Sequence, residues 1–148
     1  MTVPELPGHT EDNPFKGLIA LYLLADKLNE IITTNLVADE IIRTSEALHM
    51  IPSTSCVTLA FNSTIEGNPL RRLCKDYYVH EAAVGVLENL KEGQLPFQFI
   101  KEVLLELDRM TRHATPYDQR TKVGCVDREQ CYYHQHDDDH PKCSKASA

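Results

Sequence analysis

Hydrophobic and polar positions follow the spacing of α-helices along most of the chain. The most apolar stretch is Leu18–Asn29, in which leucine, isoleucine, alanine and tyrosine occupy nearly every side of a helix. One face of it carries residues three and four apart: Leu18, Leu21, Tyr22, Ala25 and Leu28. A helix that is apolar nearly all round needs protein on several sides. Later helices or a second chain are therefore expected to cover it.

Capping signals divide the chain into six expected helices. Asn13-Pro14 and Asn68-Pro69 each place an N-cap residue before a proline at the first helical position. Met50-Ile51-Pro52, Gly67 and Gly93 mark helix ends. The expected helices cover residues 14–28, 30–49, 53–65, 69–80, 82–90 and a last stretch that begins at 96.

The same periodicity predicts which side of each helix is buried. For the second helix the predicted buried residues are Ile32, Leu36, Val37, Ile41, Ile42 and Leu48. For the sixth helix they are Phe97, Ile100, Val103, Leu104 and Leu107. No segment up to residue 110 alternates with period two for long enough to predict a strand. The predicted fold is all-α, a compact bundle of about six short helices followed by an irregular tail rich in cysteine and histidine.

The chain divides into three predicted parts. Residues 1–13 are rich in proline and acidic residues and are expected to be disordered. Residues 14–110 form the helical body. Apolar periodicity stops after Met110, so residues 111–148 are expected to be a polar tail with little to bury, either ordered by zinc or disordered.

Composition narrows the classes of function. The net charge is −7, which argues against a nucleic-acid footprint. No apolar run is long enough for a membrane span, and the first residues lack a secretory signal pattern. The five cysteines are an odd number, which does not favour a disulfide framework. A reducing compartment, the cytoplasm or the nucleus, is therefore expected.

Three segments of the body resemble fungal BTB/POZ proteins. The end of the apolar run, Ala25-Asp26-Lys27-Leu28, resembles the end of a helix that closes the BTB domain. Ile31–Ile42 is similar to the next helix of those proteins. Ser63–Leu73, with the sequence STIEGNPLRRL, and the following Asp76-Tyr77-Tyr78 resemble the segment after the BTB core. Within the second of these segments the resemblance includes Asn35, Asp39 and Glu40.

The resemblance covers about residues 15–110 and implies a non-catalytic protein–protein interaction module. It extends to the C-terminal part of the family only, because the mixed β-sheet of a complete BTB domain has no counterpart upstream of Phe15. An adaptor role is implied, with a second copy of the chain or a cullin-type ubiquitin ligase scaffold as partner. The expected partner contacts on the first two helices are Leu18, Tyr22, Ile31 and Ile32.

The tail holds a dense group of metal-ligating residues in the pattern C-x5-C-x2-H-x-H-x3-H-x2-C. Zinc takes four cysteine or histidine ligands in a tetrahedron, and short C-x2-H steps present two ligands from one turn. The resembled fungal group has a similar C-x-Y-H-x-H ending. The expected ligands are Cys131, His134, His136 and Cys143, and Cys125 or His140 could replace one of them.

Other interpretations of the tail stay open at this point. Its cysteines and histidines could be incidental in a disordered segment, or two thiols could form a redox pair. If zinc is bound, the chain could instead be a small structural zinc protein in which the tail is the functional element.

Signals for catalysis are weak. The sequence contains no G-x-S-x-G, P-loop or dinucleotide-binding pattern. His80-Glu81 begins like a zinc-protease helix, but Val84 stands where the second histidine is needed. Arg72 and Asp76 are four residues apart on one helix and are expected to form an ion pair. The sequence therefore predicts that the protein is not an enzyme.

Overall fold

The computed structural model describes residues 13–82, 84–113, 131–137 and 139. In this part of the chain there are six helices and no strand, which confirms the predicted all-α fold. The helices are α1 (Pro14–Lys27), α2 (Ile31–Leu48), α3 (Thr54–Ser63), α4 (Pro69–His80), α5 (Val84–Glu88) and α6 (Phe97–His113). Among the described helices, none has the length and apolar character that crossing a membrane would need.

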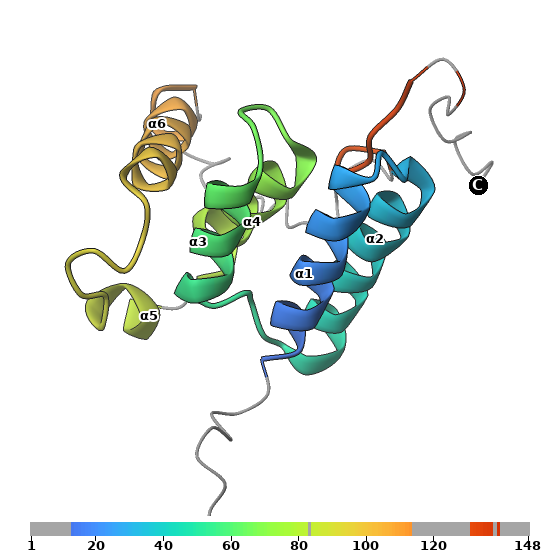
Figure 1. Ribbon diagram of the computed structural model, residues 1–148. Helices are drawn as coiled ribbons and strands as arrows, with labels where there is room; N and C mark the ends of the chain where they lie inside the picture. The colour runs from blue at the N-terminus through green and yellow to red at the C-terminus, as the bar shows by residue number, and fades with distance from the viewer. Residues whose placement is uncertain (1–12, 83, 114–130, 138, 140–148) are drawn as a thin grey trace, which may run out of the picture.

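The described helices form the predicted compact bundle, in which the α1–α2 hairpin, the α3–α4 pair and α6 lie in a row (Figure 1). A short turn joins α1 and α2 into a hairpin, and α1 also packs on α3. Next to this hairpin lie α3 and α4, and α6 packs on α4 at the far end of the row. Helix α6 ends at His113 and so continues past residue 110, the predicted end of the helical body. Of the predicted N-terminal segment, residues 1–13, only Asn13 is described.

Both predicted Asn-Pro helix starts are confirmed. The Asn13 side chain accepts a hydrogen bond from the Phe15 backbone N–H at 3.1 Å, which caps α1. The Asn68 side chain accepts one from the Leu70 N–H at 2.9 Å, which caps α4. Asn68 Oδ1 also accepts a hydrogen bond from the Tyr22 hydroxyl at 3.1 Å. The cap of α4 is therefore tied to the middle of α1.

The core lies where α1–α4 meet and is mostly apolar. Phe15, Ile19 and Tyr22 line the core side of α1. The later helices contribute Val37, Ala38, Ile41, Cys56, Val57, Ala60, Phe61, Leu70, Leu73, Cys74 and Tyr77. The first helix is only partly covered, because Leu21, Leu24 and Leu28 keep 46, 54 and 65% of their surface exposed.

The predicted buried side of α2 is only partly correct. Val37 and Ile41 are buried, but Ile32, Leu36 and Leu48 are exposed. Thr34 and Ser45 take core positions instead. The Thr34 hydroxyl donates to the Ile31 carbonyl at 2.8 Å, and the Ser45 hydroxyl donates to the Met50 carbonyl at 2.6 Å. Hydroxyl groups that are satisfied by nearby backbone can be buried at small cost, and hydropathy alone does not reveal them.

The predicted buried side of α6 is largely wrong. The side chain that anchors this helix is Phe99, which is 1% exposed. Its ring lies 5.1 Å from the ring of Phe61 on α3 and 5.1 Å from that of Tyr78 on α4, edge-to-face in both cases. Of the predicted residues only Val103 packs against the core. The others, Phe97, Ile100, Leu104 and Leu107, are exposed because the phenylalanine anchor turns them outward.

We predict that Tyr78 makes the fold sensitive to alkaline pH. Its hydroxyl donates to the Pro52 carbonyl at 3.1 Å, and burial raises its pKa from 10.0 to about 12. The unfolded chain thus loses this proton at lower pH than the folded chain, so the stability that Tyr78 contributes is complete below pH 10 and is lost as the pH rises toward 12. At pH 11 the loss is about 1.4 kcal/mol.

The test compares Tyr78→Phe with the unchanged protein in urea unfolding at pH 8 and pH 11. At pH 8 the variant should be less stable by about 1 kcal/mol, because it lacks the hydrogen bond. At pH 11 this difference should disappear, since phenylalanine does not ionise. An equal difference at both pH values would contradict the prediction.

Candidate metal centre

The described part of the tail lies against the helical body. Residues 131–137 lie against α1, α2 and α4 (Figure 1). Within this segment Tyr133 is 2% exposed and His134 is 7% exposed. The expectation that the tail has little to bury is therefore wrong for these residues, because one aromatic ring and several polar groups find partners on the body.

Helix α4 holds the first half of the segment. The Arg72 guanidinium donates to the Tyr132 carbonyl at 3.1 Å and lies over the Tyr132 ring, 5.3 Å from its centre. The Tyr133 hydroxyl donates to Asp76 Oδ2 at 2.6 Å, and both groups are buried. Arg72 and Asp76, predicted as an ion pair within one helix, thus both contact the tail.

The hairpin of α1 and α2 holds the second half through Gln135. Its backbone N–H donates to Asn35 Oδ1 at 2.7 Å, and Asn35 Nδ2 donates to the Gln135 carbonyl at 3.0 Å. The Gln135 side-chain amide donates to Asp26 Oδ1 at 2.9 Å and to the Tyr22 hydroxyl at 3.1 Å. Two hydrogen bonds between one side chain and one residue's backbone fix the position of the segment along α2.

The Tyr22 hydroxyl lies between the tail and α4. It donates to Asn68 and accepts from Gln135, which uses both of its hydrogen-bonding capacities. Burial raises the pKa of Tyr22 to about 12 and outweighs the hydrogen bond from Gln135, which lowers it. The group therefore stays protonated and keeps its role as a donor at neutral pH.

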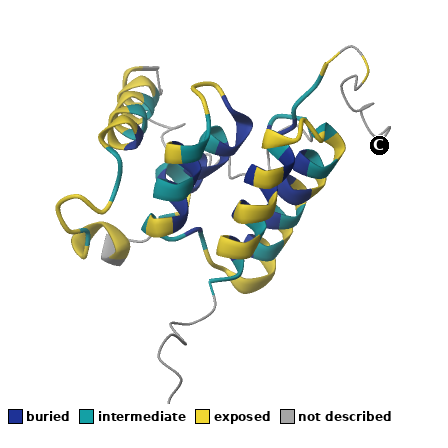
Figure 2. Cartoon of the chain, viewed as in Figure 1, coloured by how far each residue is buried: buried dark blue, intermediate teal, exposed yellow. Residues whose placement is uncertain are grey.

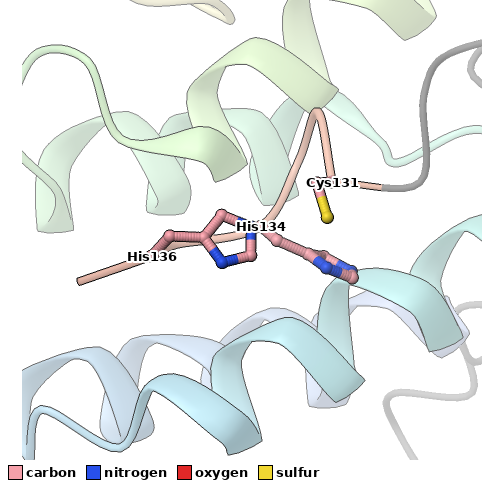
Figure 3. A group of neighbouring side chains, drawn as sticks. All are labelled: Cys131, His134 and His136. Carbon is pink, nitrogen blue, oxygen red and sulfur yellow. The ribbon is translucent and has the colours of Figure 1, made fainter. Parts of the chain in front are cut away.

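Three of the four predicted metal ligands come together in this segment. Donor atoms of Cys131, His134 and His136 all lie within 4.8 Å of one another (Figure 3), so the cluster could hold a metal ion. The backbone N–H of His134 donates to the Cys131 carbonyl at 3.1 Å, which closes a turn and brings these two residues near each other. Cys143 and the two alternatives, Cys125 and His140, lie outside the described residues.

The spacing of the cluster is close to that of a zinc site. Zinc bonds of about 2.0–2.1 Å to nitrogen and 2.3 Å to sulfur place tetrahedral ligands roughly 3.3–3.6 Å apart. The donor atoms of the cluster all lie within 4.8 Å of one another, so the widest separation exceeds this range by at most about 1 Å. The two imidazole rings are already neighbours, with centres 6.0 Å apart.

Asp39 on α2 orients one of the candidate ligands. Its Oδ1 atom lies 2.6 Å from His134 Nε2, so this nitrogen donates to the carboxylate, and the contact fixes the orientation of the imidazole ring. Histidines that bind metals usually donate their other ring N–H to a carboxylate or carbonyl in this way. Sequence reasoning missed this role, because Asp39 and His134 lie far apart in the chain and only the fold pairs them.

An open hollow lies beside His136, one member of the cluster. It has a volume of about 570 Å³ and is bordered by His136 and Gln135 on one side and by the loop between α3 and α4 on the other. Asp26 also lines it.

The four predicted partner contacts differ in how far they are exposed to solvent. Ile32 is 59% exposed, and Leu18 and Ile31 are half-buried. Tyr22 is 0% exposed, which leaves it no surface to offer a partner. The sequence placed it on the apolar face of the first helix, and in the structure this position faces the core, where the hydroxyl bonds to Asn68 and Gln135.

Comparisons of the chain with protein-family models, curated proteins and solved structures found no match.

We predict that Asn35→Ala loosens the tail segment. The variant removes both hydrogen bonds to the Gln135 backbone, which should lower the free energy of local opening by about 1–2 kcal/mol. Hydrogen exchange of the Gln135 amide should then become roughly 5–30 times faster. Asn62→Ala, at an exposed site on α3, is the matched control and should leave this rate unchanged. Equal exchange in all three proteins would show that Asn35 does not hold the segment.

Proposed function

We propose that this chain is a non-catalytic protein-interaction module in which a structural zinc ion clips the tail onto the helical body. The observation that carries the proposal is the convergence of Cys131, His134 and His136 together with the Asp39 carboxylate behind His134. A cysteine and two histidines are a typical donor set for zinc, and a carboxylate behind a ligating histidine is a usual second layer of support.

A closed coordination shell favours a structural over a catalytic role. We propose Cys143 as the fourth ligand, as the sequence pattern predicts. Four protein ligands leave no position for the bound water that a hydrolytic zinc site requires. The ion would then supply binding energy that orders the segment. This energy adds to the hydrogen bonds that Asn35 and Arg72 donate to the segment and that Asp26 accepts from it.

Zinc binding to the tail segment would also fix the arrangement of the helical body. The segment contacts α1, α2 and α4, so an ion that holds it in place also holds the α1–α2 hairpin against α4. The surface of this hairpin exposes several large apolar side chains, which supports binding to another protein. They are Leu21, Leu24, Leu28, Ile32 and Leu36. The resemblance to fungal BTB/POZ proteins supports an adaptor role for this surface.

The first test is the metal content of the purified protein. We expect one equivalent of zinc for each chain. Cys131→Ser and His136→Ala should each abolish binding at stoichiometric zinc, because each removes one ligand. His49→Asn is the control: it replaces an exposed histidine in a left-handed conformation that asparagine tolerates, and it should keep the zinc. A metal-free protein that does not take up added zinc would contradict the proposal.

Cobalt substitution identifies the fourth ligand. Thiolate-to-cobalt charge-transfer absorption scales with the number of bound cysteines, so the unchanged protein should show an intensity typical of two thiolates. Cys143→Ser should remove about half of it. An unchanged spectrum in this variant would assign the fourth position to Cys125 or His140.

We further predict that Asp39→Ala weakens zinc binding about 10- to 100-fold, because His134 loses the carboxylate that orients its ring. A competition titration with a chromophoric chelator measures this change. Glu40→Ala is the matched control, since Glu40 pairs with Arg43 and this pairing lowers the pKa of the Glu40 carboxyl group. The same loss of affinity in both variants would mean that general negative charge matters, rather than the contact between Asp39 and His134.

A further inference from the structure

The outer face of α6 exposes a row of large apolar side chains. This helix lies at the end of the row, and its side facing away from α4 is open to solvent (Figures 1 and 2). Phe97, Ile100, Leu104 and Leu107 keep 79, 40, 60 and 41% of their surface exposed. Apolar surface of this kind usually marks a contact with another protein.

The spacing of these residues is that of a helix-pairing seam. Steps of three, four and three residues separate Phe97, Ile100, Leu104 and Leu107, which is the a/d pattern of two helices packed side by side. Thr111 takes the next position of the seam. One flank of the seam packs against the body through Val103, so a partner helix must approach from the other flank.

Charges on the open flank indicate which helix fits. This flank carries Lys101 toward the start of α6 and Asp108 toward its end, seven residues apart. An antiparallel copy of the same helix brings Asp108 of the second copy next to Lys101 and Lys101 of the second copy next to Asp108. Asp108 also pairs with Arg112 at 2.9 Å, but this pair is exposed and leaves the carboxylate able to accept a second cation.

Other arrangements of the same two helices lose this complementarity. A parallel pair places Lys101 opposite Val103 or Pro96 instead of an acidic residue. An antiparallel pair shifted by one heptad toward the start of α6 places the two Lys101 side chains against each other.

We infer that α6 binds α6 of a second copy of this chain, antiparallel and with twofold symmetry. In this pair Leu104 of each copy lies against Leu107 of the other, and Ile100 lies against Thr111. Two ion pairs between Lys101 and Asp108 flank the seam. The inference deepens the proposed interaction role by naming a partner, and it does not depend on the zinc site.

The experiment measures molar mass by sedimentation or light scattering over a concentration series of the full chain. The unchanged protein should approach twice the monomer mass, and Leu104→Asp should stay monomeric. Leu36→Asp changes an equally exposed leucine on α2 and should still dimerise. Circular dichroism and zinc content, recorded on the same samples, should be unchanged in both variants, which separates this result from a failure of the metal site.

A charge exchange tests the orientation of the pair. Lys101→Glu places two acidic residues together at each of the two symmetric contacts and should raise the dissociation constant about 10-fold. The double variant Lys101→Glu/Asp108→Lys should restore dimerisation. A monomer at every concentration, a dimer that survives Leu104→Asp, or a double variant no better than Lys101→Glu alone would overturn the inference.

Discussion

The Tyr22 hydroxyl is the contact on which most of the arrangement depends. Tyr22 lies on the core side of α1. Its hydroxyl donates to Asn68, the residue that caps α4, and accepts a hydrogen bond from Gln135. One oxygen atom therefore connects the first helix, the start of the fourth and the tail. A buried polar group is costly unless it is fully satisfied, so each of the two partners, Asn68 and Gln135, helps to keep this tyrosine in place.

The tail segment is held by directional contacts more than by apolar area. Tyr133 is its deeply buried aromatic residue, and most other contacts are hydrogen bonds to side chains of the body. Each of these hydrogen bonds replaces one to water, so its net contribution to stability is small. Ordering the backbone of a chain segment costs about 1–2 kcal/mol of free energy for each residue. This balance is the physical reason why a metal ion at Cys131, His134 and His136 would matter to the fold.

Sequence periodicity predicted the elements better than the faces. Asn-Pro caps at Asn13 and Asn68 gave two helix starts correctly, because capping is local chemistry that the sequence displays directly. The buried side of α6 was mispredicted, because four apolar residues share one face and Phe99 lies on another. The rings of Phe61 and Tyr78, which both contact the Phe99 ring, determine which side turns inward. Contacts between helices determine which side of a helix is buried, and the sequence of one helix does not reveal these contacts.

The candidate site shows the same division. Cys131, His134 and His136 are close in the chain, so their spacing alone suggested that they bind one metal ion together. Asp39 and Asn35 lie on α2, about a hundred residues before the segment they hold, and no local pattern could pair them with it. They entered the sequence argument only through a resemblance to other proteins.

The paired hydrogen bonds between the Asn35 side chain and the Gln135 backbone fix the register of the tail segment on α2. Asn35 binds the backbone of its partner residue, so it sets which position along the tail lies opposite α2 whatever side chain that position carries. Inserting or deleting a single residue between Cys131 and Gln135 would slide the thiol out of reach of the imidazoles while every helix stayed intact. The number of residues between Cys131 and Gln135 is therefore constrained by this backbone contact, in addition to the constraint that Tyr22 and Asp26 place on the Gln135 side chain.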